Sequence, residues 1–310
     1  MRQGAFKLFS FAGISVYVHW MWFLAAFYLV DNPIDQYSSK LWNVAEVLAL
    51  FGIVLLHEFG HQFACRSVGG KTHDIVIWLL GGVALVTPPP RPKAELWSIA
   101  AGPLVNLVLV PIIAVFVSAS AHLGWADTNP DLYQFAHSVW WINVGLLIFN
   151  ILPIYPMDGG QILRCLLWFP FGRSNSLFIA SIVGYIGAAV LVLLVVAQFL
   201  AGQTSAAIWL GIVTFFIVTR CWTGLQQARA LGRVDKMPRR AGFECPSCHA
   251  KPPLGRLWRC GRCRGPFDPF ESQGTCPHCG QQYSGTQCLD CGNSAPLTVW
   301  GGGDELRVVQ

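Results

Sequence analysis

The sequence HEFGH, at positions 57–61, constrains this chain most because it lies inside an apolar run from residue 44 to residue 65. Two histidines four residues apart lie on the same face of a helix, so both imidazoles can hold one metal ion. A glutamate between them is the usual general base of a zinc hydrolase. Ionisable side chains are costly within a membrane and rare there without a function. The segment therefore predicts His57 and His61 as metal ligands, with Glu58 as the base.

The composition is that of a polytopic membrane protein. Of 310 residues, 54% are hydrophobic and 12% are charged, and the mean hydropathy is +0.48. Soluble proteins carry about 25% charged residues. Six segments approach the roughly 20 apolar residues that cross a bilayer. They cover residues 14–30, 45–65, 96–118, 137–154, 177–200 and 206–222.

We therefore expect an α-helical polytopic membrane protein of about six transmembrane helices, with a membrane-associated β-hairpin. The expected domains are a membrane domain over residues 1–235, a small zinc-ribbon region over 236–300 and a flexible C-terminus over 301–310. The loops rich in Lys and Arg alternate with loops that carry almost none, which predicts that both termini are cytosolic.

The hairpin is predicted from residues 72–87, which read THDIVIWLLGGVALVT. Two apolar, β-branched runs are separated by Gly81 and Gly82, and a glycine pair in that position is typical of a hairpin turn. An exposed strand edge there could pair with the backbone of an extended peptide. Alternatively, the hairpin only closes the cytosolic mouth of the membrane domain.

A third metal ligand is expected in the fourth apolar segment, which is interrupted by NILPIYPMDGG over residues 150–160. Two prolines and a glycine pair cannot continue a regular helix, so the backbone groups there need partners within the protein or in water. A catalytic zinc takes three protein ligands and keeps one position open. Asp158 is the best candidate, because the glycines after it allow close approach of the backbone.

Eight of the eleven cysteines form four CxxC pairs near the C-terminus. Each pair can present two thiolates to one tetrahedral ion, so the four pairs predict two structural zinc sites in a double ribbon. The sequence leaves the combination of pairs open, and the simplest one joins neighbouring pairs. The first site would then use Cys245, Cys248, Cys260 and Cys263, and the second Cys276, Cys279, Cys288 and Cys291.

Contact with a cytosolic protein partner, rather than with nucleic acid, is the expected role of this ribbon region. The net charge of +5 favours a basic surface. Eight thiolates on two zinc ions would cancel most of that charge.

In their order and spacing, these motifs resemble the site-2 protease family, the zinc metalloproteases that cut within membranes. The family pattern HExxH followed by NxxPxxPxDGG is matched by HEFGH and NILPIYPMDGG. Residues 13–20, GISVYVHW, are similar to the first span of the bacterial sporulation-type branch, and residues 79–106 to the family's segment from hairpin to GPxxN. The resemblance covers roughly residues 10–225. One difference is Gln161, where many relatives have arginine.

The resemblance implies an intramembrane zinc endopeptidase in a bacterial cytoplasmic membrane, with one catalytic zinc ion and a single-span membrane protein as substrate. The four cysteine pairs add two structural zinc ions to this expectation. Asn106 is a candidate oxyanion donor or an interhelical hydrogen-bonding residue. Asn150 either orients the substrate or caps the break. His19 lies near the site or is simply packed. A catalytically silent scaffold and, less favoured, a metal transporter are the alternatives.

Overall fold

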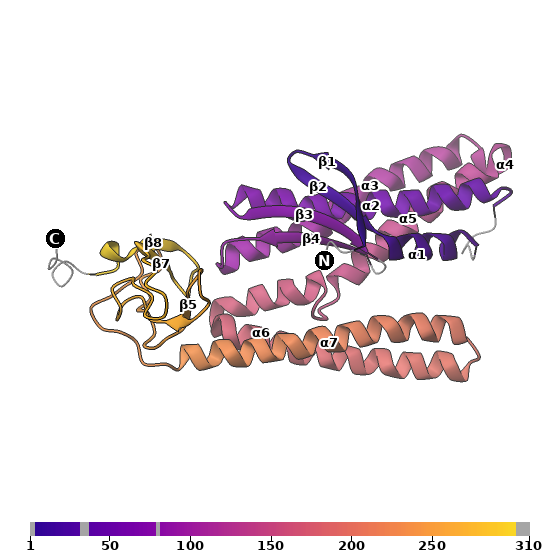
Figure 1. Ribbon diagram of the computed structural model, residues 1–310. Helices are drawn as coiled ribbons and strands as arrows, with labels where there is room; N and C mark the ends of the chain where they lie inside the picture. Colours follow the sequence, from indigo (N-terminus) through magenta and orange to yellow (C-terminus); the bar gives the residue numbers. More distant parts are fainter. Residues whose placement is uncertain (1–3, 32–36, 79–80, 302–310) are drawn as a thin grey trace. The chain divides into compact units, whose positions relative to one another are not determined.

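The computed structural model describes residues 4–31, 37–78 and 81–301, and these form two units (Figure 1). The first unit comprises Met1–Pro88 and Pro92–Gln226, and the second comprises Pro89–Arg91 and Gln227–Gln310. Most of the expected flexible C-terminus, residues 302–310, lies outside the described residues. The first unit contains β1 (Ala5–Phe11), β2 (Ile14–His19), α1 (Trp20–Asp31), α2 (Lys40–Ser67), β3 (Lys71–Trp78), β4 (Gly81–Thr87), α3 (Pro92–His122), α4 (Trp125–Thr128), α5 (Pro130–Ile151), α6 (Asp158–Leu200) and most of α7 (Thr204–Asp235).

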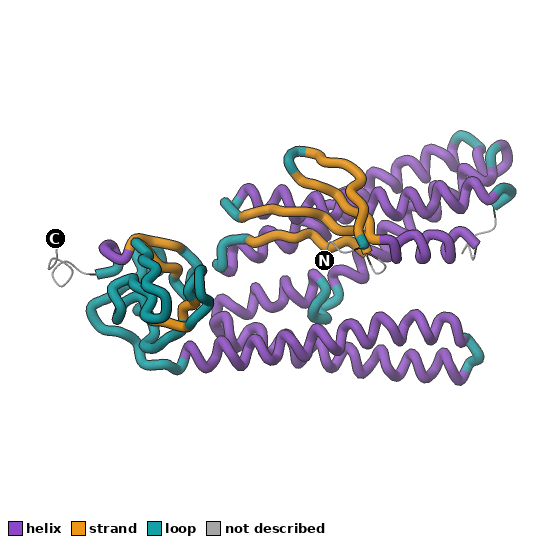
Figure 2. Tube along the Cα trace, viewed as in Figure 1, coloured by secondary structure: helices purple, strands orange, loops and turns teal. Residues whose placement is uncertain are grey.

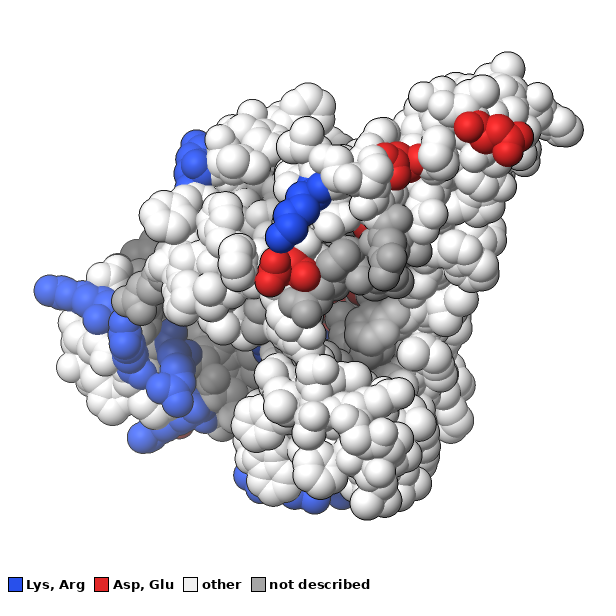
Figure 3. Space-filling model, turned by 90° about the vertical axis from the view of Figure 1, so that its right-hand side faces the viewer, with Lys and Arg blue, Asp and Glu red and all other residues white. Residues whose placement is uncertain are grey.

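Five of the described helices are long and apolar enough to cross a membrane: α2, α3, α5, α6 and α7. Uncharged residues cover most of the face shown in Figure 3, as expected for a surface in contact with lipid. The chain is thus an integral membrane protein, as its composition predicts. About six spans were predicted, and the described residues contain five by this measure, because the described part of α1 has 12 residues.

The predicted first span, residues 14–30, divides between a strand and a helix. Ile14, Val16 and Val18 of β2 are buried, while the residues between them are partly exposed. This alternation is the two-residue period of a strand with one covered face. Only the second half of the segment, from Trp20, forms a helix.

The strands form one sheet in the order β1-β2-β3-β4, in which β2 and β3 are parallel and the outer pairs are antiparallel. Its buried side chains pack on α2, where Phe59 joins the same apolar cluster. The fully buried Gln62 of α2 donates from Nε2 to the backbone oxygen of Asp74 on β3 (3.3 Å). The sheet is therefore fixed to the helix that carries HEFGH.

The hairpin prediction is confirmed for the strands β3 and β4 but wrong for its turn. Gly81 and Gly82 belong to β4, where they pair with Trp78 and Ile77. Residues 79–80, which join the two strands in sequence, lie outside the described residues.

The break predicted in the fourth apolar segment is present. Helix α5 ends at Ile151, and α6 begins at Asp158 after the loop over residues 152–157 (Figure 2). A Cβ on Gly159 or Gly160 would overlap the backbone of this loop, so only glycine allows the start of α6 to lie so close to it. The loop is also held by α7, whose Cys221 Sγ donates to the backbone oxygen of Tyr155 (3.1 Å).

The second unit is built from short strands around an aromatic core rather than from metal sites alone. Trp258, Phe267, Phe270 and Trp300 pack with the buried cysteines in one cluster. Its elements are β5 (Trp258–Arg259), β6 (Pro266–Phe267), β7 (Gly285–Gln287), β8 (Ser294–Pro296) and the 3₁₀ helix η1 (Leu297–Val299).

Candidate active site

Three predicted metal ligands meet inside the first unit. His57 and His61 come from α2, and Asp158 is the first residue of α6. Nε2 of His57 lies 3.0 Å from Oδ2 of Asp158, Nε2 of His61 lies 3.3 Å from the same oxygen, and the two Nε2 atoms are 3.1 Å apart. Both histidines are buried. One ion could reach all three ligand atoms, which lie within 4.8 Å of one another.

The hydrogen bonds on the far side of the rings fix which nitrogens carry protons. Nδ1 of His61 faces the backbone oxygen of Ser98 (2.9 Å), which can only accept. Asn143 Nδ2 donates to the backbone oxygen of Asn106 (3.0 Å), so its Oδ1 accepts from Asn106 Nδ2 (2.9 Å). Asn106 Oδ1 is then the acceptor for Nδ1 of His57 (2.6 Å). In the neutral imidazoles, both Nε2 atoms therefore carry a lone pair, and these two nitrogens lie 3.1 Å apart.

Two lone pairs at 3.1 Å repel unless they share a cation, so this donor set suits a metal ion. Helix α3, which faces the two histidines, leaves room for a metal ion. A Cβ on Gly102 of α3 would overlap Nε2 of both histidines. Two imidazoles and one carboxylate are the ligand set of a catalytic zinc site.

Glu58 lies beside the ligands and under β4. Its side chain is buried, and a Cβ on Gly82 would overlap its carboxyl group. The carboxylate also accepts a hydrogen bond from the backbone of Ala84. Gly82 therefore allows β4 to pack closely against the predicted base, and it does not form a turn.

In the structure, the Asn106 side chain is not positioned as the predicted oxyanion donor. Both polar atoms of its fully buried side chain bond within the protein, to His57 and to Asn143. The interhelical hydrogen bond, which was the alternative, is the one observed, and it also orients a metal ligand. The sequence reasoning missed Asn143, Ser98 and Gly102, although Gly102 lies in the GPxxN motif.

The other two candidates lie outside the ligand cluster. Asn150 is half-buried at the end of α5, directly before the break. His19 ends β2, accepts a hydrogen bond from the backbone of Met21 (3.3 Å) and packs against Trp20 and Trp78.

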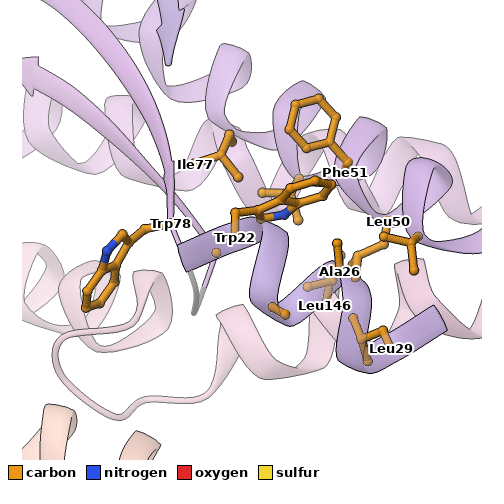
Figure 4. A pocket seen from close by; sticks show the side chains of 12 residues that line it. Trp22, Ala26, Leu29, Leu50, Phe51, Ile77, Trp78 and Leu146 are labelled. Carbon is orange, nitrogen blue, oxygen red and sulfur yellow. The ribbon is translucent and has the colours of Figure 1, made fainter. Parts of the chain in front are cut away.

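An apolar pocket of about 200 Å³ lies between α1, α2, α5 and the tip of the hairpin (Figure 4). Trp22 and Ala26 line it from α1, Val54 from α2, and Trp78 and Gly81 from the hairpin. Val54 precedes His57 by one helical turn, and Gly81 precedes the glycine under which Glu58 packs. The pocket is thus lined by the two segments, on α2 and β4, that also carry residues of the site.

The tail cysteines form two groups of four, but not in the predicted combination. The sulfurs that face each other lie 3.6–3.8 Å apart. A tetrahedral ion with Zn–S bonds of about 2.3 Å requires about 3.8 Å, so both groups fit zinc. The outer group contains Cys245, Cys248, Cys288 and Cys291, and the inner group contains Cys260, Cys263, Cys276 and Cys279.

The combination is nested because the two ends of the tail meet. Phe243 forms a β-bridge with Gly301, and the backbone N–H of Glu244 donates to the oxygen of Trp300 (2.7 Å). These bonds hold the segment with the first CxxC pair close to the segment with the last pair. The two middle pairs then meet each other, with Cys260 and Cys263 in the turn between β5 and β6.

In the inner group, hydrogen bonds favour the thiolate form of Cys260. The backbone N–H of Cys263, followed by the hydroxyl of Tyr283, lowers the pKa of the Cys260 thiol to about 5. Such N–H donors stabilise the charged form, which is the form that binds zinc.

Comparison with known proteins agrees with this site. Residues 45–129 and 128–194 match the model of peptidase family M50. "Zinc metalloprotease MJ0392" of Methanocaldococcus jannaschii is 33% identical over 178 residues, which are 57% of this chain and 50% of that protein. "Stage IV sporulation protein FB" of Bacillus subtilis is 28% identical over 169 residues, 53% of this chain and 52% of that protein.

A solved structure, "Site-2 Protease from Methanocaldococcus jannaschii", is 26% identical and matches 71% of this chain and 95% of that chain, with a TM-score of 0.49. The chain spans about half the length of the curated relatives named above. The matched residues contain all three ligands and Glu58. The match over residues 45–194 identifies the segment that carries the site as peptidase family M50, the family of the site-2 proteases.

Proposed function

We propose that the protein is an intramembrane zinc endopeptidase that hydrolyses peptide bonds within transmembrane segments of other membrane proteins. The observation that carries the proposal is the buried cluster of His57, His61 and Asp158, with the Glu58 carboxylate beside it. This combination supplies three ligands and one general base, which is what metal-assisted hydrolysis requires.

A zinc ion held by the three ligands would supply Lewis acidity, polarising a water molecule and the scissile carbonyl. Glu58 accepts the proton of the attacking water and returns it to the amide nitrogen as the peptide bond breaks. Asn106 and the backbone oxygen of Ser98 hold the two imidazoles in the tautomer that leaves Nε2 free to bind the metal. Asn150 remains a candidate for substrate contact at the break.

Strand β4 is the proposed binding edge for the substrate. It ends the order β1-β2-β3-β4, so its outer backbone groups have no neighbouring strand within the described sheet. A transmembrane helix hides its peptide bonds in its own hydrogen bonds, and it must unwind before hydrolysis. Pairing with β4 would give the freed N–H and C=O groups partners beside Glu58.

We further propose one catalytic and two structural zinc ions per chain, both termini in the cytosol and a bacterial cytoplasmic membrane as the location. The tail, with its two four-cysteine groups, would then face a cytosolic protein partner. These proposals are supported by the family, the distribution of Lys and Arg, and the cysteine geometry.

The proposal is tested with purified protein in proteoliposomes that also contain a single-span model substrate with helix-destabilising residues. Glu58→Gln should retain zinc and lose about 10²- to 10⁴-fold in cleavage rate. Glu46→Gln, on the same helix, is the matched control and should cleave as the wild type does. Cleavage by Glu58→Gln at the wild-type rate would refute the assignment of the base.

Two other outcomes would favour the alternative functions. A zinc-loaded wild type that cuts no member of a substrate panel would support a silent scaffold. Zinc flux across the vesicle membrane without proteolysis would support a transporter.

A further inference from the structure

A buried ion pair outside the reacting groups joins α3 to α6. Nη2 of Arg164 donates to Oε2 of Glu95, and the two side chains are only 13% and 10% exposed. Desolvation of two charges offsets much of their attraction, so a buried pair is a weak source of stability. A role in fixing geometry would better explain its presence.

The pair lies on the face of α3 that already holds the two histidines. Glu95, Ser98, Gly102 and Asn106 follow one another at intervals of three, four and four residues, and all are buried. Such spacing places them on one side of a helix. Ser98 bonds to His61 through its backbone and Asn106 bonds to His57, so this face orients both imidazoles.

Among the described residues, the third ligand makes no comparable bond to α3. Asp158 is the first residue of α6, and the residue before it, Met157, makes no side-chain cap. The loop before α6 is irregular, so the position of Asp158 depends on where the body of α6 lies. Arg164 is six residues further along, which is about 9 Å of helix.

The guanidinium of Arg164 is itself held in place. It lies 5.8 Å from the ring centre of Trp168, one turn further along α6. Its Nε is buried and has no hydrogen-bond partner among the described residues, so Glu95 is its principal anion. The first turn of α6 is tied separately to the break, where Gln161 Nε2 donates to the oxygen of Pro156 (3.0 Å).

We propose that Glu95 and Arg164 are positioning residues, whose ion pair sets α6 against α3 so that Asp158 meets His57 and His61 at one metal ion. The proposal rests on the metal site of the proposed function. Through one face, α3 thus places all three ligands: two by direct hydrogen bonds and the third through its helix.

The test measures the zinc affinity of the intramembrane site by competition with a chelator, in full-length protein whose tail ions serve as an internal count. Glu95→Asp keeps the charge but shortens the arm by one methylene. It should fold with an unchanged unfolding temperature and bind intramembrane zinc 10- to 100-fold more weakly. Arg164→Met should weaken zinc binding at least as much, and the exchange Glu95→Arg with Arg164→Glu should restore part of the loss.

The role of Asp158 is isolated by repeating the measurement in an Asp158→Ala background. If the pair acts through Asp158, Arg164→Met should cause no further loss of affinity there. A purely structural pair would weaken the remaining two-histidine site by the same factor as in the wild type. Lys40→Met, which breaks the exposed pair of Lys40 with Asp31, is the control and should leave zinc affinity unchanged.

The proposal is overturned if Glu95→Asp and Arg164→Met bind intramembrane zinc as tightly as the wild type, or if their effects persist undiminished without Asp158. Because cleavage is not the readout, this result is separate from the fate of the proposed activity. A wild type that binds the third ion but cuts no substrate would refute the protease and leave the positioning test intact.

Discussion

Replacement of Gly102 by alanine adds one methyl group where α3 faces both metal-binding histidines. The new Cβ would stand 2.7 Å from Nε2 of His57 and closer still to Nε2 of His61. Neither ring can simply turn away, because each Nδ1–H is bonded to α3. The methyl group would therefore push the ligand atoms out of the position in which they share an ion.

Two effects of this change have opposite signs. Glycine inside a helix costs about 1 kcal/mol relative to alanine, so the helix itself should become more stable. Loss of an outer hydrogen bond to a metal ligand typically weakens binding 10- to 100-fold. Because the methyl group displaces the ligand atoms themselves, we expect at least about 100-fold weaker zinc binding in the membrane unit.

The assay is metal content per chain after dialysis against a weak chelator, together with thermal unfolding of the zinc-free protein. The variant should fall from three zinc ions to two, with the tail sites intact. The zinc-free variant should unfold at a somewhat lower temperature than the zinc-free wild type, because the methyl group crowds two held rings and the helix propensity of alanine offsets only part of that strain. Gly52→Ala, on α2, is the matched control because its Cβ would meet nothing within 4 Å, and it should keep three ions.

A Gly102→Ala protein that retains the third ion with wild-type affinity would refute the reasoning. It would mean either that the two histidines do not share a metal at this wall, or that α3 can move away at little cost. Loss of the tail ions as well would indicate general misfolding and would equally contradict the prediction.

Three further changes follow from the same geometry. Asn106→Ala should weaken intramembrane zinc binding 10- to 100-fold in a chelator titration, because His57 loses its acceptor. Cys245→Ser with Cys291→Ser should remove one tail zinc ion in native mass spectrometry and leave the other, whereas two lost ions would favour the sequential combination. Ala26→Phe, which fills the apolar pocket, should raise KM for substrates with bulky apolar side chains and leave zinc content unchanged.

The ligands were predictable because their chemistry requires fixed residue types at fixed spacing. HEFGH places two imidazoles on one helical face, and a carboxylate beside a helix break offers the third ligand. The residues that orient these ligands are not fixed by ligand chemistry in the same way. The backbone oxygen of Ser98 could belong to any residue type, and a glycine such as Gly102 contributes by having no side chain.

The first predicted span was wrong because hydropathy averages over a window. Residues 14–30 are apolar on average, yet their first six alternate between buried and partly exposed positions. That two-residue period was present in the sequence as Ile14, Val16 and Val18, and it distinguishes a strand from a helix. The prediction relied on the length of the apolar segment, whereas the two-residue period of its first half indicates a strand.

The nested cysteine groups could not be predicted from spacing, because intervals between pairs constrain loop length and not the path of the chain. What selects the outer pairing is the meeting of the two tail ends at Phe243 and Gly301. The bidentate ion pair of Arg239 with Asp290 links the same two segments (2.8 and 3.2 Å). Neither contact has a sequence motif.

The same contrast explains why α3, rather than the helix that carries HEFGH, organises the site. A helix that offers two ligands fixes the spacing of their Cα atoms but leaves the rotation of each ring free. Rotation is fixed from outside, and the third ligand must be placed independently of the first two. One face of α3 meets both requirements, with acceptors for both rings and a carboxylate, Glu95, paired to the helix of Asp158. The spacing of 95, 98, 102 and 106 would have been visible in the sequence as a small and polar stripe on an apolar helix, which is rare enough in a membrane span to predict a contact surface for the site.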